Sequence, residues 1–439
     1  MNGNDARAVA YRLLFNCSEK KTYSNIALDG YLKNSGLAPE NKRFAAALAY
    51  GTLERLYTLD RIIAEYSNKP VDKLSIQVRC ALQLGFYQLL YMDSVPQSAA
   101  VNESVKLVKR YMKDTAAAGY VNGVLRSFIR SGMKLPEAAD KLDGLAMRYS
   151  CPPWLVHKWF EEYSEKQAMS LLESSVGRPP VTVRVNTLKC SAQELAKLLS
   201  ADGFETAENK TLPNCLDIVR GEDIENSNAY REGLFHVQDI SSQICCQALE
   251  LSENDTLIDV CSAPGGKAFT CAELMNGKGS IIACDLHEKR VALIKRGAQR
   301  LGLNNITASV NDARKFNSDL PKADKVLCDV VCSGLGVIRR KPEIKYKAPD
   351  ELKRLPDIQY EILKTSAQYV KDGGVLVYST CTVSKAENEK VVERFLQENK
   401  NFTPVSVCEE LDLNEPFVTM TPDMFGGDGF FIAKLKRVK

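Results

Sequence analysis

The stretch that most constrains the fold is Thr256–Thr270, which reads TLIDVCSAPGGKAFT. Its short apolar run, Leu257–Val260, predicts a buried strand, and a helical pattern begins after the turn at Gly265 and Gly266. Open α/β sheets use such a strand, turn and helix to present backbone amides to a ligand at the carboxyl ends of their strands. The sequence therefore predicts a ligand-binding turn in a parallel sheet.

The chain after this turn repeats the alternation of strand and helix. Three more apolar runs precede turns or helical patterns: Ser280–Cys284, Lys325–Cys328 and Gly374–Tyr378. Helices are expected at about 266–275, 287–302 and 351–371. This order predicts a Rossmann-like α/β domain with a mostly parallel sheet and helices on both faces. Gly429–Leu435 predicts a late antiparallel strand at the edge of the sheet.

The first part of the chain carries a helical signal throughout. Apolar residues recur at helical spacing in Ala6–Leu14, Leu74–Leu89 and Val101–Met112. Further helices are expected at about 24–34, 41–66 and 115–130. An all-α domain over residues 1–135 is therefore predicted.

The middle of the chain does not continue the all-helical pattern. A helical stretch around Trp154 follows Pro152-Pro153, and strands are predicted at Val181–Val185 and Leu216–Val219. We expect linker helices and a small α/β domain over residues 136–235. The domain with the glycine turn then covers residues 236–439.

Charge is unevenly distributed. Residues 1–135 contain 19 Lys and Arg against 11 Asp and Glu, a net charge of +8, whereas the whole chain carries +3 and the remainder thus −5. A basic helical domain suits a polyanion such as RNA, although lysines on solvated helix surfaces give the same count. The sequence therefore indicates a nucleic-acid partner without requiring one.

Composition excludes several classes of protein. No apolar run reaches 18 residues and the first residues lack a signal peptide, so neither a membrane span nor export is expected. The 14 cysteines are then expected to be reduced thiols in a cytoplasm. Three single histidines and the lack of a C-x-x-C pair argue against a metal site.

Three ligand classes compete for the glycine turn. A nucleoside triphosphate requires G-x-x-x-x-G-K-[ST], but Cys261 stands five residues before Gly266, and Ala268 follows Lys267. The G-x-G-x-x-G of dinucleotide sites is also missing. Asp285 closes the next strand 19 residues after Gly266, a suitable separation for reaching ribose hydroxyls. A phosphate-free nucleoside such as S-adenosylmethionine is therefore favoured.

Further reactive side chains end or follow strands. Asp312 could accept from an adenine amino group, and Asp329 could lie between cofactor and reacting base; either could instead cap a helix. Cys332 and Cys381 also lie where a strand meets a loop. A thiolate there could add to carbon 6 of a pyrimidine and make carbon 5 nucleophilic, which is covalent catalysis, while the second cysteine serves as base or assists release. The other twelve cysteines are interpreted as core residues.

These motifs together resemble the Nop/Sun family of RNA cytosine-5 methyltransferases. The matching residues cover about 150–439 and comprise Cys261–Lys267 (CSAPGGK), Asp285, Asp312, Asp329, Cys332-Ser333, Ser379–Thr382, Asp428–Phe431, Gln238-Asp239 and Arg184–Asn186. The helical first domain resembles the RNA-binding antitermination factor NusB. That combination resembles the bacterial Sun/RsmB branch, which methylates a cytosine of small-subunit ribosomal RNA.

The resemblance implies a role for each motif. Cys381 would be the nucleophile, Cys332 would promote product release, and Asp329 would contact both base and cofactor. S-adenosylmethionine would be held by Asp329, Asp285, Asp312 and the turn residues Cys261, Ser262, Ala263, Pro264, Gly265, Gly266 and Lys267. The middle domain would be the family's RNA-recognition-like insert. One departure is Val331, where the family commonly has a proline that would stiffen the loop before Cys332.

The predicted function is S-adenosylmethionine-dependent methylation of carbon 5 of a cytosine in 16S ribosomal RNA. A covalent adduct with carbon 6 and a monomer acting on single-stranded or loop RNA are expected. The segment Arg339–Lys347, with five cations in nine residues, is predicted to contact phosphates beside the site or to be a solvated loop. The same chemistry on transfer RNA, or a non-catalytic RNA-binding assembly factor, are the alternatives.

Overall fold

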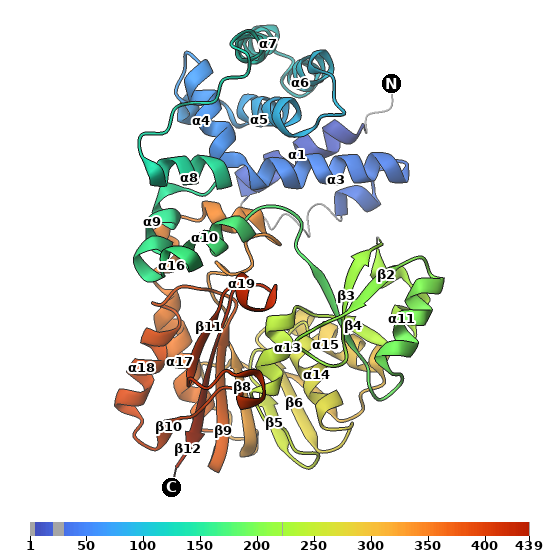
Figure 1. Ribbon diagram of the computed structural model, residues 1–439, viewed down its shortest axis with the longest axis vertical. Coiled ribbons are helices and arrows are strands. Elements are labelled where there is room, and N and C mark those ends of the chain that lie inside the picture. Colours follow the sequence, from blue (N-terminus) through green and yellow to red (C-terminus); the bar gives the residue numbers. More distant parts are fainter. Residues whose placement is uncertain (1–4, 21–29, 222, 439) are drawn as a thin grey trace. The chain divides into compact units, whose positions relative to one another are not determined.

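The computed structural model describes residues 5–20, 30–221 and 223–438. It divides into two compact units, Met1–Gly177 with Ile338–Lys347 and Arg178–Val337 with Ala348–Lys439 (Figure 1). No helix in the described residues is both long and apolar enough to cross a membrane. Most of the helix predicted at about 24–34 lies outside the described residues.

The first unit is built from helices. Those before residue 135 are α1 (Ala6–Lys20), α3 (Pro39–Glu54), α4 (Leu56–Tyr66), α5 (Ile76–Tyr91), α6 (Gln97–Met112) and α7 (Thr115–Arg130). Their apolar residues recur every three or four positions, so Leu13, Leu82 and Phe128 meet in one buried core. The predicted helix at 41–66 is two helices because the chain turns at Arg55. The all-α prediction for this region is confirmed.

Shorter helices complete the first unit. They are α8 (Lys141–Tyr149), α9 (Pro153–Glu162), α10 (Glu165–Ser174), and the 3-10 helices η1 (Val71–Lys73) and η3 (Pro342–Tyr346). The stretch around Trp154 forms α9, with Trp159 fully buried, as its apolar spacing predicts. The η3 helix comes from the far part of the chain and packs against α3.

The second unit begins with a small antiparallel sheet. Its strands lie in the order β2 (Glu205–Glu208), β3 (Cys215–Arg220), β1 (Val181–Val185) and β4 (Phe235–Val237). Helix α11 (Ala192–Ala201) starts with a reciprocal capping box between Ser191 and Glu194 and places Leu195 on the core of this sheet. The short helices η2 (Ile224–Asn226) and α12 (Asn228–Arg231) lead into β4.

A larger sheet of eight strands forms the rest of the second unit. Its parallel part runs β9 (Val370–Thr380), β8 (Ala323–Asp329), β5 (Thr256–Asp259), β6 (Ser280–Asp285) and β7 (Ile306–Val310). Antiparallel strands extend it beyond β9: β12 (Phe430–Arg437), β10 (Phe402–Pro404) and β11 (Phe417–Met420). The Rossmann-like, mostly parallel prediction is confirmed.

Both faces of the large sheet are buried under helices. Leu257, Leu327 and Val377 share a core with α13 (Ile240–Gln247), α14 (Gly266–Leu274) and α15 (Glu288–Leu301). The next residue along each of these three strands points to the opposite face, as period-2 alternation requires. Ile258, Cys328 and Tyr378 therefore pack with α17 (Leu355–Ala367) and α18 (Glu389–Glu398). The short helices α16 (Pro349–Leu352), α19 (Pro422–Phe425) and η4 (Glu409–Leu411) lie in the connections.

The sheet departs from the sequence prediction in the position of β12 and in three strands that the sequence prediction did not include, β7, β10 and β11. The late strand β12 is antiparallel, but it lies between β9 and β10, so its predicted edge position is wrong. All six residues Phe430–Leu435 are buried, which an edge position would not provide. The strand at the opposite edge is β7, whose residues are half-buried or exposed and carry no clear apolar signal.

A buried ion pair joins the small sheet to the helix after the glycine turn. Arg184 on β1 donates through Nε to Glu273 Oε2 on α14 over 3.1 Å, and both side chains are almost fully buried. His236 on β4 lies 3.2 Å from the Thr270 hydroxyl of the same helix. Burial and the nearby Arg184 lower the pKa of His236 to about 3, so this contact involves a neutral imidazole. The small sheet thus helps to fix the orientation of α14.

Candidate active site

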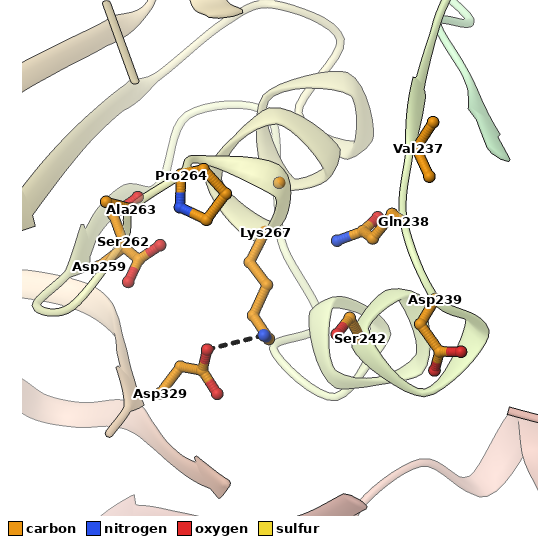
Figure 2. Close-up of a pocket in the computed structure, with 11 residues that line it drawn as sticks. Val237, Gln238, Asp239, Ser242, Asp259, Ser262, Ala263, Pro264, Lys267 and Asp329 are labelled. Atoms are coloured by element: carbon orange, nitrogen blue, oxygen red, sulfur yellow. Dashed lines mark hydrogen bonds and ion pairs between the residues drawn. The ribbon is translucent and has the colours of Figure 1, made fainter. Parts of the chain in front are cut away.

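A cavity of about 220 Å³ opens at the carboxyl end of β5 (Figure 2). Open α/β sheets bind their ligands at this edge. The residues that surround it come from the glycine turn, from the end of β4 through the start of α13, and from the ends of β5 and β8. They are Val237, Gln238, Asp239, Ser242, Asp259, Ser262, Ala263, Pro264, Gly266, Lys267 and Asp329.

The glycine turn forms one wall of this cavity. Five of its predicted ligand-binding residues line it: Ser262, Ala263, Pro264, Gly266 and Lys267. Gly265 has φ +115°, a conformation that other residues rarely adopt, and a Cβ there would overlap the Phe269 ring. Cys261 and Gly265 belong to the turn but are not among the lining residues.

Lys267 and Asp329 both line the cavity, and their side chains point toward one another (Figure 2). Lys267 Nζ lies 2.7 Å from Asp329 Oδ2, and Asp329 Oδ1 accepts a hydrogen bond from Ser379 Oγ at 2.8 Å. Burial lowers the pKa of Lys267, but Asp329 and neighbouring thiols outweigh it and raise that pKa above its ordinary value. The ammonium group is therefore charged and holds the Asp329 carboxylate in place.

Asp259 is a cavity residue that the sequence prediction did not single out. Its side chain is fully buried, and neither carboxylate oxygen has a hydrogen-bond partner of good geometry. Burial, with the nearby Asp329 charge, raises the pKa of Asp259 to about 7. The available signal was an acid inside the apolar run Leu257–Val260, at the end of a strand.

Asp259→Asn is expected to stabilise the ligand-free protein at pH 8 but not near pH 4. The unfolded chain loses the Asp259 proton near pH 3.9, whereas the folded protein keeps it up to about pH 7, so stability falls as pH rises between these values. The expected gain above pH 7 is on the order of 4 kcal/mol, because each of the roughly three pKa units is worth about 1.36 kcal/mol. Thermal unfolding at pH 4 and pH 8 measures it, with the exposed Asp319→Asn as control. Equal pH dependence in wild type and Asp259→Asn would contradict the expectation.

Asp285 and Asp312 lie at neighbouring strand ends, outside the cavity lining. Asp285 is buried, and its oxygens accept from the His287 amide and pair with Arg290, each at 3.1 Å. Arg290 also donates to the Ala263 carbonyl at 2.7 Å, so it links Asp285 to the glycine turn.

The Asp312 carboxylate is held by Arg314. Two hydrogen bonds of 3.1 Å join its two oxygens to the guanidinium. These hydrogen bonds lower the pKa of Asp312, so the carboxylate is ionised at neutral pH. The structure thus places both predicted acids at the ligand edge of the sheet but pairs each with an arginine that the sequence prediction did not include.

Cys332 and Cys381 meet at the ends of adjacent strands. β8 and β9 are parallel and pair Asp329 with Ser379, so the chain following each strand emerges on the same edge. The two Sγ atoms are 3.1 Å apart, although 49 residues separate the cysteines in sequence. The hydrogen bond with Cys381, followed by burial, raises the pKa of Cys332 well above its ordinary value. Cys332 is therefore a protonated thiol at neutral pH.

The loop before Cys332 carries Val331 where the resemblance led us to expect a proline, and other side chains hold it. Gln359 Nε2 donates to the Val331 carbonyl at 3.0 Å, and the Ser333 amide donates to Glu387 Oε2 at 2.8 Å. The backbone on both sides of Cys332 is thus fixed by side chains from elsewhere in the fold. The Val331 side chain itself is 56% exposed.

The basic segment Arg339–Lys347 differs from its prediction. It packs with the first compact unit, and Lys345 is fully buried there, with Nζ donating to the Tyr149 carbonyl at 3.0 Å. Burial lowers the pKa of Lys345. A phosphate contact by this lysine is excluded, so the prediction that five cations face RNA is wrong at that position. Its other four cations are half-buried.

Three family models match the chain, each over a different region. Residues 246–436 match "16S rRNA methyltransferase RsmB/F", residues 4–130 match the NusB family, and residues 151–225 match the ferredoxin-like domain of RsmF/B-like methyltransferases. The predicted boundaries of 1–135, 136–235 and 236–439 stay a prediction.

Whole-length relatives and solved structures agree with these matches. The chain is 37% identical to the probable ribosomal RNA small subunit methyltransferase B of Bacillus subtilis, with 100% of both chains covered. It is 35% identical to the probable protein of the same name from Synechocystis, with 98% of this chain and 99% of the relative covered. The crystal structure of PH0851 is similar with a TM-score of 0.83, 26% identity and 98% of each chain covered.

The similarity extends over the helical first domain, the small sheet and the large parallel sheet alike. The glycine turn and the paired cysteines lie in the part that matches the methyltransferase model. From the relatives that it matches over its whole length, the chain belongs to the RsmB/F family of 16S rRNA methyltransferases.

Proposed function

We propose that the protein methylates carbon 5 of a cytosine in 16S ribosomal RNA through a covalent bond between Cys381 and carbon 6. The observation that carries the proposal is the approach of Cys332 and Cys381 to 3.1 Å at the ligand edge of the sheet. Asp329 lines the cavity and bonds to Ser379, two residues before Cys381, so it links the cavity to the thiols. Membership of the rRNA methyltransferase family supports the substrate class.

The polar atoms of the cavity fit S-adenosylmethionine. Three buried side chains there have polar atoms that make no hydrogen bond of good geometry: Gln238 Nε2, Ser262 Oγ and both oxygens of Asp259. A ligand with an ammonium, a carboxylate and hydroxyl groups can satisfy such donors and acceptors. Cys261–Lys267, Asp285, Asp312 and Asp329 are the residues proposed to hold it. When bound, it supplies the methyl group that carbon 5 takes.

The chain's own residues account for the remaining chemistry. Carbon 5 of cytosine is a poor nucleophile until the Cys381 thiolate bonds to carbon 6 and places an electron pair on carbon 5. After methylation, the carbon-5 proton passes to solvent, the electron pair that it leaves re-forms the double bond between carbons 5 and 6, and the bond between carbon 6 and the Cys381 sulfur breaks. The protonated Cys332 thiol, whose sulfur lies 3.1 Å from the Cys381 sulfur, can donate a hydrogen bond to the departing thiolate and so assist this release. Asp329, fixed by Lys267 and Ser379, would contact the base.

The proposed RNA substrate is single-stranded or looped. A base must leave its stack to reach half-buried thiols, and this costs least where it is unpaired. The NusB-like first domain supports RNA binding by analogy with its family. We propose a monomer acting in the cytoplasm, in keeping with 14 free cysteines.

Bisulfite sequencing of total RNA tests the proposal directly. Compared with the parent strain, a strain lacking the protein should convert one additional cytosine of 16S rRNA, and restoring the protein should protect it again. A protected cytosine in transfer RNA would instead identify the same chemistry on the alternative substrate. An unchanged conversion pattern would favour a non-catalytic assembly factor. Restoration with Cys190→Ala, a half-buried cysteine of the small sheet domain, serves as the matched control.

A further inference from the structure

The two cysteine loops rest on a buried polar cluster that the mechanism above does not use. Its members are Glu387, Asn388 and Gln359, none of them more than 2% exposed. Glu387 and Asn388 are consecutive residues just before α18, and Gln359 lies on α17. Burying a carboxylate and two amides is costly unless each is hydrogen-bonded. What these side chains bond to therefore indicates why they are there.

Glu387 binds the Cys332 loop. Its Oε2 accepts from the Ser333 amide at 2.8 Å, and its Oε1 accepts from the Ser333 hydroxyl at 2.6 Å. Gln359 Nε2 donates both to Glu387 Oε2 and to the Val331 carbonyl, each at 3.0 Å. The residues immediately before and after Cys332 are thus held by one pair of side chains.

Asn388 binds the Cys381 loop in the same manner. Its Oδ1 accepts from the Thr380 hydroxyl at 2.6 Å, and its Nδ2 donates to the Thr382 carbonyl at 3.0 Å. Asparagine at the start of a helix normally caps it, but the Asn388 side chain makes no cap hydrogen bond to α18. Helix α18 therefore lacks this stabilisation, and the Asn388 amide instead forms hydrogen bonds with both neighbours of Cys381.

The hydrogen bonds made by Glu387 and those made by Asn388 belong to one connected network. Glu387 and Asn388 are adjacent in the backbone, and the Ser333 and Thr382 hydroxyls lie 2.7 Å apart. The Glu387 carbonyl also accepts from the Tyr378 hydroxyl on β9 at 2.6 Å. A role in stability alone does not explain why the hydrogen bonds of this cluster go to the four residues that flank the two cysteines. These residues are Val331, Ser333, Thr380 and Thr382.

We propose that Glu387 and Asn388 are positioning residues, one for each cysteine, that together set the distance between the two sulfur atoms. The inference rests on the roles proposed for Cys332 and Cys381. Misplacing a reacting group by about 1 Å can cost about a hundredfold in rate, so even isosteric changes that break these bonds should slow turnover.

Glu387→Gln and Asn388→Asp test the inference because each keeps the size of the side chain. The first replaces one carboxylate oxygen with an amide nitrogen, which cannot accept from Ser333, and the second places an oxygen against the Thr382 carbonyl. Matched controls on the exposed face of α18 are Glu393→Gln and Gln397→Glu. Ser333→Ala, which removes one bond to Glu387 without adding volume, is a milder third variant should the first fail to fold.

Two measurements are combined. Phenylarsine oxide binds stably only where two thiols lie close together, and we call this binding capture. The part of the capture that Cys332→Ala lacks requires both cysteines, so it reports the distance between them. Methyl transfer to 16S rRNA gives kcat and KM. We expect Glu387→Gln and Asn388→Asp to slow capture about tenfold and to lower kcat about a hundredfold, with the RNA KM and S-adenosylmethionine affinity within about twofold of wild type.

Capture and kcat equal to those of the control variants would overturn the inference. So would a loss that is matched by an equal loss of S-adenosylmethionine binding and of thermal stability, because that would be a general structural role. If wild type itself does not methylate cytosine, the proposed function fails, and capture alone then decides whether these residues set the thiol distance.

Discussion

Cys381→Ala is expected to abolish methyl transfer to 16S rRNA, with a loss of about 10⁴-fold or more. Without the sulfur, carbon 5 of the base cannot gain the electron pair that it needs, and no neighbouring group replaces a nucleophile. The Cys332 thiol does not substitute, because its burial still raises its pKa when Cys381 is replaced. Transfer of a labelled methyl group from S-adenosylmethionine measures the loss.

The loss should be confined to chemistry. Cys381 does not line the cavity, so calorimetry should find S-adenosylmethionine binding to Cys381→Ala within about twofold of wild type. Cys190→Ala, another half-buried cysteine, should retain full activity. Unimpaired turnover in Cys381→Ala would remove Cys381 as the nucleophile.

Cys332→Ala is expected to trap the protein on its RNA. If Cys332 assists release, its loss should leave the bond between Cys381 and carbon 6 unbroken after methylation. The adduct should appear as a band of reduced mobility on a denaturing gel, in a yield approaching one per protein chain. The Cys332→Ala variant thus separates the step in which the Cys381 sulfur adds to the base from the step in which the base is released.

The double variant Cys332→Ala with Cys381→Ala is the control for this experiment. It should form no band, because the sulfur that bonds to RNA is absent. A folded Cys332→Ala protein that turns over normally without an adduct would contradict the release role. An adduct that persists in the double variant would assign the covalent bond to another residue.

Much of the fold could be predicted because its elements carry strong local signals. The parallel strands β5, β6, β8 and β9 are buried on both faces and read as apolar runs. The strand β7 was missed because it lies at the edge and presents Thr307 and Ser309 among its five residues. The position of β12 was wrong because strand order is a property of pairing across the sheet, which no local pattern records.

The candidate site, like the fold, could be predicted only where the sequence carries a local signal. The glycine turn and the two cysteines stand out in the sequence because each is a compact motif at the end of a strand. Arg290, Gln359 and Glu387 do not stand out, since an isolated polar residue on a helix or loop usually faces solvent. Their importance depends on hydrogen bonds to residues 27 or more positions away, which only the folded chain brings together. The prediction for Lys345 was wrong for the converse reason: a cation in a basic run was expected at the surface, but this one is buried.

The parallel pairing of β8 with β9 has a consequence for how such a protein can change over evolutionary time. Parallel neighbours must be joined by a long crossover, and surface connections tolerate insertion and deletion. The crossover here holds α16, α17 and the segment 338–347 that packs with the helical unit. Since the ladder between the strands brings the two cysteine loops to one edge, the parts of this connection outside α17, whose Gln359 holds the Cys332 loop, can be lengthened, shortened or recharged while the two loops stay together. Substrate preference can therefore diverge while the reaction stays the same.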